Sequence, residues 1–549
     1  MARRVLAPGL LVVAVLTYLP VLAHGGFVID DWASLARIHE PSPGLAPFRA
    51  MLDVGGSRVL AAAQYSLTAA VLGNHPWPYF VLALAIAVGI AVLLFAILRS
   101  YGLPAVVAGG AATLSIVLPA SDVSRAWTTL GPAQTAVLLY LGGLLVAHRA
   151  LRERSPRLHA LSLALYLAAV FEHEQTLPLV AGSVLLYLPV ATWRDAVRRG
   201  ACDLLVALLS AAVAAFAPAP AQTRTPSGQW LDHGREFAQR VANTLWDTFT
   251  LYRTGPSAWA AAALVAVVAA AIAVLATRGG EETRRAARTI AIAGALSAAA
   301  VALAYAIYVP ANPALLPDLP GPLGRVSVAA VVPLAVFVAV LAWGAVLALT
   351  SASPRMAPAA LGLALAAICV GSAIQTHSEM EAWGDAARAE RSALHAARAV
   401  QPAPPRGAVF LLLGAPSDRP IERAGMVSSV TVLNEAWVTT SALRVTFGRN
   451  DVFGVVVRAG DTLACERAAL ILSRPGLPAS LTDVRERGGR ESLYGLGPEF
   501  HTRGSLYNVP AATYPRVVLV RLGAAPRAWV PRDAADCRRA VAAAQAGGA

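Results

Sequence analysis

Residues 5–32, VLAPGLLVVAVLTYLPVLAHGGFVIDDW, decide how this chain folds. The part 5–23 is almost wholly apolar and about as long as the hydrocarbon core of a bilayer is thick, so it predicts a membrane-spanning helix. Two aspartates, Asp30 and Asp31, follow where the chain leaves the bilayer. Carboxylates are costly at that depth unless something pairs or uses them. The pair is therefore either the start of a solvated loop or a functional site that supplies a general base or a metal ligand.

The composition indicates a polytopic membrane protein. Of 549 residues, 57% are hydrophobic and only 14% are charged, whereas an ordinary soluble domain carries about 25% charged residues. The net charge of +13 comes from arginine, since the sequence contains no lysine. These arginines cluster in short loops between apolar runs, which is typical of the cytoplasmic side of a membrane protein. The basic charge therefore reports membrane topology, and we expect no nucleic-acid partner.

Apolar runs predict about eleven spans. After the first, they cover 78–98, 104–119, 132–148, 158–171, 176–191, 202–218, 257–276, 287–308, 327–349 and 356–376. The arginine clusters, which begin with Arg3 and Arg4, all fall on one side and place the N-terminus in the cytoplasm. The first span resembles a signal peptide, but the many spans after it favour a retained anchor helix. We expect an integral protein of the bacterial inner (cytoplasmic) membrane.

The sequence predicts two parts. Residues 1–376 form a mainly α-helical transmembrane bundle, in which residues 24–77 make a long first extracytoplasmic loop with a surface helix. Residues 377–549 form a C-terminal extracytoplasmic α/β domain, because a charged helical stretch is followed by short β-like runs with Gly and Pro between them. Cys465 and Cys537 both lie in this tail, where an oxidising compartment would allow a disulfide.

Four groups of polar residues lie on the predicted outer face. They are Asp30 with Asp31, Asp122 with Arg125 and Trp127, the turn Glu172-His173-Glu174, and Arg325 after a proline-rich loop. Each of the last three groups also has a purely structural interpretation. Asp122 and Arg125, one helical turn apart, would form a local ion pair, Glu172-His173-Glu174 would be a solvated turn, and Arg325 would be a snorkelling side chain. Their co-location at one membrane face, more than any single group, indicates a site.

The order of the first features resembles the GT-C class of membrane glycosyltransferases, which use polyprenyl-phosphate sugars and include mannosyl- and arabinosyltransferases. Asp30-Asp31-Trp32 follows the first span. The helix predicted over 57–72 carries Arg58 and leads through Gly73-Asn74-His75-Pro76 into the next span, similar to the arginine-bearing surface helix of that class. The resemblance covers roughly residues 1–376.

Later features resemble the same class. Glu172-His173-Glu174 occupies the place of a short Lys-Glu or Tyr-Glu motif, and Arg325 resembles a phosphate-contacting arginine of a late outer loop. The chain departs in carrying His173 where a lysine is frequent and in having no Asp-x-Asp motif. Metal dependence is therefore left open. If a divalent cation such as Mg²⁺ or Mn²⁺ takes part, the expected ligands are Asp30, Asp122 and Glu174.

The resemblance implies transfer of a sugar from a polyprenyl-phosphate donor to a glycan, lipid or protein acceptor on the outer face. A carboxylate would take the proton of the acceptor hydroxyl, and Asp31, slightly preferred to Asp30, is the expected general base. Arg325 is the first candidate for the phosphate and Arg58 the second, because a guanidinium binds phosphate with bidentate geometry. The remaining groups would orient the acceptor: Asp122, Arg125, Glu172, His173 and Glu174.

Three other classes of protein share a polytopic build. A transporter or lipid flippase would show inverted repeats or interrupted helices near the midplane, and we find no clear internal repeat. A lipid-linked glycan polymerase or ligase would work on the same side but rely more on arginine and histidine than on a first-loop carboxylate. A scaffold without activity would tolerate loss of Asp30 and Asp31. The sequence has no nucleotide-binding motif, and a donor activated by its lipid phosphate needs none.

Overall fold

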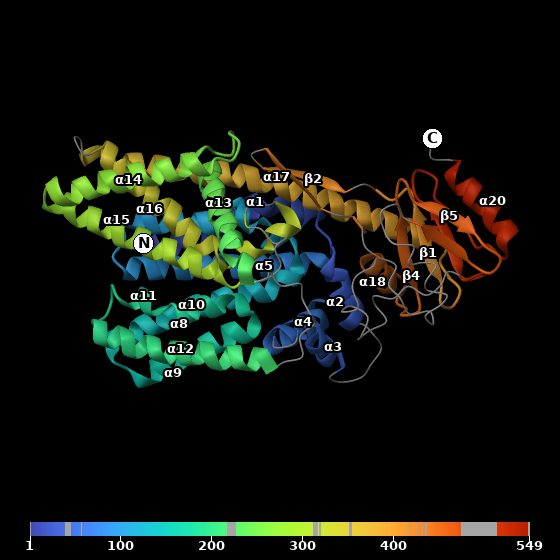
Figure 1. The fold of residues 1–549 in the computed structure, drawn as a ribbon, viewed down its shortest axis with the longest axis horizontal. Coiled ribbons are helices and arrows are strands. Elements are labelled where there is room, and N and C mark those ends of the chain that lie inside the picture. Colours follow the sequence, from blue (N-terminus) through green and yellow to red (C-terminus); the bar gives the residue numbers. More distant parts are fainter. Residues whose placement is uncertain are drawn as a thin grey trace.

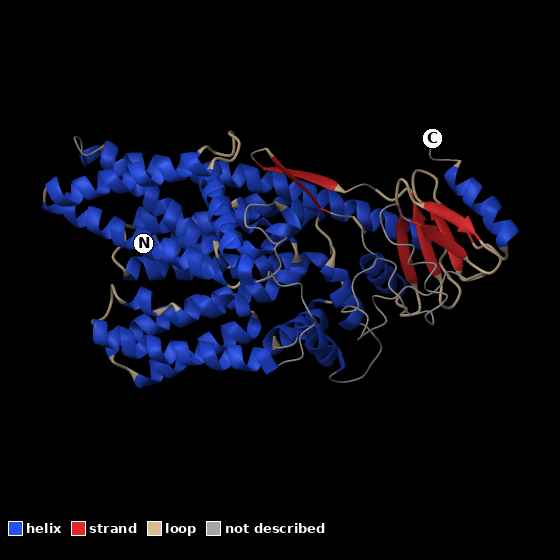
Figure 2. Cartoon of the chain, in the orientation of Figure 1, coloured by secondary structure: helices blue, strands red, loops and turns tan. Residues whose placement is uncertain are grey.

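The structure is a computed structural model that describes residues 2–546 apart from 39–45, 56–57, 217–226, 311–316, 318–319, 351–353, 417, 424, 431, 434–435 and 474–512. A bundle of helices occupies one end of the molecule, and a small sheet with flanking helices occupies the other (Figure 1, Figure 2). The fold is mainly α with a C-terminal α/β region, as predicted. Ser57, the first residue of the predicted surface helix, lies outside the described residues.

Seven of the described helices are long and apolar enough to cross a membrane. They are α1 (Ala2–His24), α5 (Pro76–Ser100), α8 (Gly131–Glu153), α14 (Ala258–Arg278), α15 (Glu281–Ala306), α16 (Val331–Leu349) and α17 (Ala357–Val400). Apolar runs of this length form helices because each backbone N–H and C=O must find its partner within the segment when no water is present. The chain is thus an integral membrane protein.

The other four predicted spans are short, broken or charged. They correspond to α6 (Ala105–Val117), α9 (Pro156–Glu172), the pair α10 (Leu177–Ala181) and α11 (Val184–Tyr187), and α12 (Trp193–Phe216). α12 carries Arg199 and Asp203, a buried ion pair with an N–O distance of 2.9 Å, and these charges lower its mean hydropathy. By length and composition, the prediction of about eleven spans is therefore supported for seven.

Three short helices form the segment predicted as the first extracytoplasmic loop: α2 (Asp30–Ile38), α3 (Ala46–Gly55) and α4 (Val59–Leu72). The last of these corresponds to the predicted surface helix. Its exposed side chains are apolar, with Leu60, Leu67 and Val71 on one side, whereas Tyr65 and Ala69 line a pocket on the other. An apolar outer side of this kind suits a helix that rests at the membrane interface.

Short helical elements connect the bundle helices at both ends. The described 3₁₀ turns are η1 (Pro119–Ser121), η2 (Thr128–Leu130), η3 (Glu174–Thr176), η4 (Ser227–Gln229), η5 (Gly321–Ser327) and η6 (Pro354–Met356). Two further helices are α7 (Asp122–Ala126) and α13 (Trp230–Phe249). The turns η2, η3 and η5 matter most here, because each carries residues of the candidate site.

The C-terminal region is built on a four-stranded sheet with the order β4-β1-β7-β8. Its strands are β1 (Val409–Leu413), β4 (Phe453–Val457), β7 (Val517–Arg521) and β8 (Arg527–Trp529). The central strand β1 is parallel to β4 and β7, with Leu411 opposite Val455 and Leu519. The edge strand β8 is antiparallel to β7, so the sheet is mixed.

Helices cover both faces of this sheet. Phe410 and Leu412 of β1 pack into the core that contains α18 (Ala436–Phe447). Val409 and Leu411 pack into a second core that contains α20 (Ala534–Gln545). A parallel strand that is buried on both faces must be apolar throughout, which explains the continuous apolar sequence of β1.

Two antiparallel hairpins complete this region: β2 (Arg419–Arg423) with β3 (Met426–Val430), and β5 (Thr462–Cys465) with β6 (Leu470–Ser473). A disulfide joins Cys465 of β5 to Cys537 of α20, which confirms the predicted pair. Disulfides persist in oxidising compartments. The bond is therefore consistent with an extracytoplasmic C-terminal region.

The helix α17 links the bundle to the C-terminal region. It is 44 residues long, or about 66 Å at 1.5 Å per residue, which is roughly twice the thickness of a hydrocarbon core. Figure 1 shows it passing from the bundle toward the sheet. The domain boundary predicted between residues 376 and 377 thus falls inside one continuous helix. Its outer half buries Met380 and Trp383.

A buried ion cluster fastens the β2–β3 hairpin to the bundle. Arg423 of β2 donates to both carboxylate oxygens of Glu379 in α17, at 2.8 and 2.6 Å, and lies 3.8 Å from Asp122 of α7. All three side chains are buried. Asp122 also accepts a hydrogen bond of 3.4 Å from the backbone N–H of Gly321, the first residue of η5. The cluster therefore joins four segments that are far apart in the sequence.

We expect Arg423→Met to lower the free energy of unfolding by roughly 3–5 kcal/mol, because it leaves two buried carboxylates without their cation. Arg235→Met is the matched control: it removes an ion pair to Asp232 in which the side chains are 72% and 77% exposed. That change should cost less than about 1 kcal/mol. Unfolding of both variants and wild type in the same detergent measures the difference. Equal losses in the two variants would contradict the role of the cluster.

Candidate functional site

The turn that leads from α1 into α2 is tightly packed. A Cβ on Gly25 would lie 2.3 Å from a carbonyl oxygen of α1, and one on Gly26 would lie 2.6 Å from the guanidinium of Arg391. Arg391, on α17, donates to the carbonyl oxygens of His24 and Gly25 at 2.7 and 2.6 Å. These bonds satisfy carbonyls that the end of a helix leaves without partners. The chain is thus fixed in position as it leaves the first span.

The residue just before the acidic pair has a strained backbone. Ile29 has a φ of +48°, a left-handed conformation that a β-branched residue adopts at a cost of about 1–3 kcal/mol. Asp31 stabilises this turn: its Oδ2 accepts from the Val28 N–H at 3.1 Å, and its own N–H donates to the Val28 carbonyl at 3.0 Å. Strain of this kind is found most often at functional sites.

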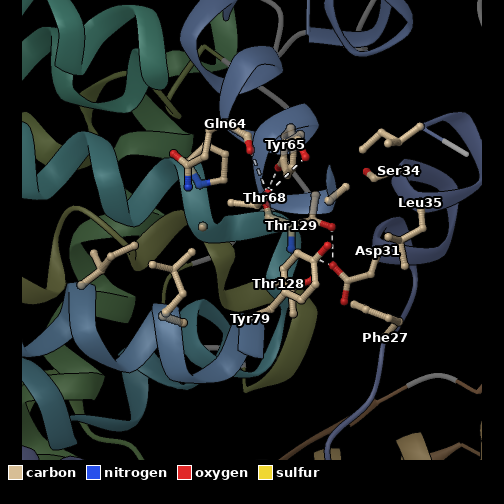
Figure 3. Close-up of a pocket in the computed structure, with 17 residues that line it drawn as sticks. Phe27, Asp31, Ser34, Leu35, Gln64, Tyr65, Thr68, Tyr79, Thr128 and Thr129 are labelled. Atoms are coloured by element: carbon tan, nitrogen blue, oxygen red, sulfur yellow. Dashed lines mark hydrogen bonds between the residues drawn. The ribbon is translucent and has the colours of Figure 1, made fainter. Parts of the chain in front are cut away.

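Asp31 is held by several hydrogen bonds. Its side chain is 2% exposed, and its Oδ1 accepts from the backbone N–H of Thr129 at 2.7 Å and from the Thr129 hydroxyl (Figure 3). Burial raises the pKa of Asp31 to about 6, and the hydrogen bonds from Thr129 limit the rise. Asp31 therefore binds the start of α2 to η2.

Asp30 is the accessible member of the pair. Its side chain is 37% exposed, and its Oδ2 lies 4.0 Å from a terminal nitrogen of Arg325, which is 41% exposed. The guanidinium carbon of Arg325 lies 5.7 Å from the ring centre of the buried Trp127, a cation–π contact. Burial raises the pKa of Asp30, and the charge of Arg325 opposes that rise. A carboxylate and a guanidinium thus share one open face.

The Glu172-His173-Glu174 turn forms another side of the same cluster. Arg58, which precedes α4, donates from Nε to Glu174 at 2.6 Å and from a terminal nitrogen to the second oxygen of the same carboxylate. His173 Nδ1 lies 3.9 Å from Glu174. Burial, and then the charge of Arg58, lower the pKa of His173 to about 4, so the imidazole is neutral at neutral pH. Glu172 is buried, and its Oε1 has no hydrogen-bond partner among the described residues.

These groups lie close enough for their charges to affect one another. The charges of Arg58 and Arg325 both lower the pKa of His173. The hydroxyl of Tyr65, on α4, is acted on by four predicted site residues: Arg58, Asp31, Asp30 and Glu172. The structure therefore brings the predicted site residues together at one end of the bundle, where Asp122 and Arg125 also lie but contact other partners.

Asp122 and Arg125 are directed to other partners. Asp122 belongs to the buried ion cluster with Arg423. Arg125 is buried and donates to the Ser115 carbonyl at 3.1 Å and to the Ser124 hydroxyl at 2.5 Å. These are the contacts of side chains that hold segments together. The acceptor-orienting role expected for the two residues stays a prediction, and we do not include them in the cluster.

The three predicted cation ligands do not share one place. Each lies beside a different arginine: Asp30 beside Arg325, Asp122 beside Arg423, and Glu174 beside Arg58. Within the described ranges, no three His, Cys, Asp or Glu side chains are grouped so that they could hold a metal ion. Within the described part of the chain, Asp30, Asp122 and Glu174 therefore do not together form a Mg²⁺ or Mn²⁺ site.

A small pocket lies beside Asp31 (Figure 3). It is lined by residues of α2, α4, α5 and η2, among them Tyr65 and Thr129. Its volume of about 40 Å³ leaves room for a few water molecules and is far below that of a small-molecule site, so a sugar does not fit there in this conformation. The open side of the cluster is instead the one that Asp30 and Arg325 share.

Several residues that build the site carry little signal in the sequence. Thr129, which makes two hydrogen bonds to Asp31, cannot be told from other threonines. Tyr308 donates to Gln175 at 3.2 Å and so ties the segment after α15 to η3. Trp127 stands beside Arg125 in the sequence, and only the structure shows Arg325 over its ring. An aromatic residue at the outer end of a span is a weak signal, because such residues are common at membrane interfaces.

Comparison with known proteins adds no relative. No protein-family model matches the chain, and neither a curated protein nor a solved structure matches it. The class that the fold defines is therefore a helical integral membrane protein with a C-terminal α/β region. The resemblance to the GT-C class rests on the residues of this chain alone.

Asp31→Asn should change how stability depends on pH. Burial raises the pKa of Asp31 from 3.8 to about 6, so the folded state holds this proton more tightly than the unfolded chain. Wild type therefore loses stability as the pH rises through this interval, whereas asparagine does not titrate. Relative to the variant, the free energy of unfolding of wild type should fall by roughly 3 kcal/mol between about pH 4 and 7. Chemical unfolding of both proteins in detergent measures this free energy at each pH. If the difference between them does not depend on pH, Asp31 does not have the raised pKa that its burial predicts.

Proposed function

We propose that the protein is a glycosyltransferase that moves a sugar from a polyprenyl-phosphate donor to an acceptor at the outer face of the membrane. The observation that carries the proposal is the 4.0 Å approach of Asp30 to Arg325 on the open side of the cluster. The reaction needs both groups: a carboxylate to take the acceptor's proton and a cation for the phosphate leaving group. A membrane face is also where a lipid-linked donor presents its phosphate.

The connections of the bundle favour eleven passes, as in a GT-C-like topology. α5 begins beside Asp31, since Tyr79 lines the same pocket. α8 also begins beside Asp31, whose carboxylate binds Thr129, so the short α6 between them must carry the chain back across. α9 likewise returns the chain from the far end of α8 to Glu172 in the cluster. Short or charged helices can cross where neighbouring helices shield them from lipid.

The orientation follows from charge and from the disulfide. The arginine clusters favour a cytoplasmic N-terminus, and an odd number of passes then puts both the acidic cluster and the C-terminal region outside. The Cys465–Cys537 bond supports the same side for the C-terminal region. In a bacterium, this corresponds to the outer face of the inner membrane.

Asp30 is the better candidate for the general base, although the sequence slightly favours Asp31. A base must reach the proton that it takes. Asp30 is open to the surface, whereas Asp31 is buried and already accepts hydrogen bonds from Val28 and Thr129. The pKa of Asp30 is also raised toward neutral pH, and a general base works best when its pKa is near the pH of the reaction. Asp31 then acts as a positioning residue that fixes the start of α2.

Arg325 suits the lipid phosphate. A guanidinium offers a planar group that binds phosphate through two nitrogens, and contact with the Trp127 ring limits the orientation of this one. In the transfer, the acceptor oxygen forms a bond to the anomeric carbon while the bond from that carbon to the phosphate oxygen breaks. The acceptor proton goes to Asp30, and the negative charge that develops on the polyprenyl phosphate is stabilised by Arg325.

The neighbouring turn is suited to the sugar. Arg58 is bound through two nitrogens to Glu174, which makes it second to Arg325 as a phosphate ligand. His173 is neutral, and Glu172 has a buried oxygen without a hydrogen-bond partner in the described structure. We assign these two side chains to sugar hydroxyls, which would supply the missing partner.

Sugar transfer from radiolabelled polyprenyl-phosphate sugars, measured in membranes that contain the protein, tests the proposal. Asp30→Asn should lower the rate by about 10²- to 10⁴-fold, because it removes the proton acceptor. Arg325→Ala should lower it by about 10²- to 10³-fold, because it removes the cation that meets the leaving group. The exposed pair Asp232→Asn and Arg235→Ala serves as the control and should leave the rate unchanged.

Two results would count against this function. Transfer that is unaffected by either Asp30→Asn or Arg325→Ala, with equal amounts of protein in the membrane, would exclude the assigned site. If wild type transfers no sugar from any tested donor, a lipid-linked glycan ligase or a transporter becomes the better description.

A further inference from the structure

A second cavity lies at the other ends of α1, α5 and α8. Its volume is about 490 Å³, within the range of small-molecule binding sites. Its lining has two parts, an apolar wall and a basic rim. The wall includes Leu6, Val92, Phe95 and Leu145, and the rim consists of Arg99, Arg149 and Arg152. A cavity built in this way suits an amphiphile with a negative head.

This cavity lies about one membrane thickness from the acidic cluster. Tyr79 lines the pocket beside Asp31, and Ser100, at the end of the same helix α5, lines the second cavity. The segment between them rises about 30 Å at 1.5 Å per residue, which matches a hydrocarbon core. The cavity therefore faces the opposite leaflet, on the side where the arginine clusters of the sequence fall.

The three arginines of the rim keep most of their donors available. Arg99 donates to the Leu103 carbonyl, and Arg152 donates to the Ser100 carbonyl at 2.6 Å. Each bond uses one of the five N–H groups of a guanidinium. In the part of the chain that the structure describes, no ion pair joins Arg99, Arg149 or Arg152 to a carboxylate. The rim arginines Arg99 and Arg152 are thus held in position by backbone carbonyls, which do not neutralise their positive charge.

A buried polar contact shapes the wall beneath the rim. His148 is buried and lines the cavity. Its Nδ1 lies 3.3 Å from the Ser100 hydroxyl and its Nε2 lies 3.0 Å from the Tyr101 hydroxyl, which donates to the Leu186 carbonyl at 2.6 Å. These contacts fix the end of α5 against α8, so the cavity is a built feature of the helix packing.

We propose that this cavity binds one anionic phospholipid of the inner leaflet, with its phosphate against Arg99, Arg149 and Arg152 and an acyl chain along Val92 and Phe95. The apolar wall favours a lipid over a soluble phosphate, because a soluble anion would leave that wall exposed. The unneutralised rim favours an anionic head over a zwitterionic one. The site is separate from the proposed transfer reaction and does not depend on it.

Native mass spectrometry of the full chain in detergent, titrated with phosphatidylglycerol and with phosphatidylcholine of the same acyl chains, tests the proposal. Wild type should retain one phosphatidylglycerol more tightly than phosphatidylcholine. Arg149→Gln with Arg152→Gln should weaken phosphatidylglycerol binding about thirtyfold, since each arginine near anionic lipid contributes about five- to sixfold in affinity. Arg194→Gln with Arg198→Gln is the matched control, because both arginines are exposed near the start of α12 and neither lines the cavity.

A second variant separates the cavity from its charge. Ala96→Leu fills part of the cavity beside its apolar wall and leaves all three arginines in place. It should therefore also abolish the tight binding of phosphatidylglycerol. Glycerol 3-phosphate, which offers the same phosphate without acyl chains, should not displace the lipid. Equal retention of the two lipids by wild type, equal losses in the two double variants, or displacement by glycerol 3-phosphate would each overturn the proposal.

Discussion

Two buried carboxylates on α17, Glu379 and Glu390, constrain the whole outer part of the molecule. A buried carboxylate is strongly disfavoured unless it is paired and hydrogen-bonded, so each must be met by groups from other segments. Glu379 receives Arg423 of the β2–β3 hairpin. Glu390 receives the indole N–H of Trp32 at 2.8 Å and the backbone N–H of Leu433 at 3.0 Å. One helix thereby holds the first outer loop and the C-terminal region in a fixed relation.

The same constraint reaches the candidate site. Trp32 follows Asp31 directly, so its bond to Glu390 fixes the first turn of α2, while the neighbouring Arg391 of the same helix fixes the preceding turn. The strained backbone of Ile29 is maintained between these two attachments. Asp30 therefore needs no tight contact of its own to stay in place. It remains open to the surface, where a substrate can approach it.

The bundle follows from the sequence more directly than the site does, because hydropathy acts locally. Long apolar runs predict the seven strongest spans, and counting them predicts that Asp30 and Arg325 lie on the same face of the membrane. Their direct approach depends on how distant turns pack, which no local pattern encodes. Arg423 stands in an ordinary hairpin, so its ion pairs are likewise unforeseen.

The charged residues after 376 suggest a new domain, yet α17 continues because tertiary partners meet buried charges such as Glu379. The disulfide was predictable, since only Cys465 and Cys537 lie in the tail.

The continuity of α17 also sets a rule for how this protein can change over generations. An α-helix turns about 100° for each residue, so one residue gained or lost between Glu379 and Glu390 would rotate one carboxylate away from its donors while the other stayed. No single substitution elsewhere could restore the lost bonds without breaking those that remain. The stretch is therefore fixed in length, and its composition can vary only outside buried positions such as Met380 and Trp383. Descendants of this chain should align through it without gaps, whereas the loops around it can grow or shrink.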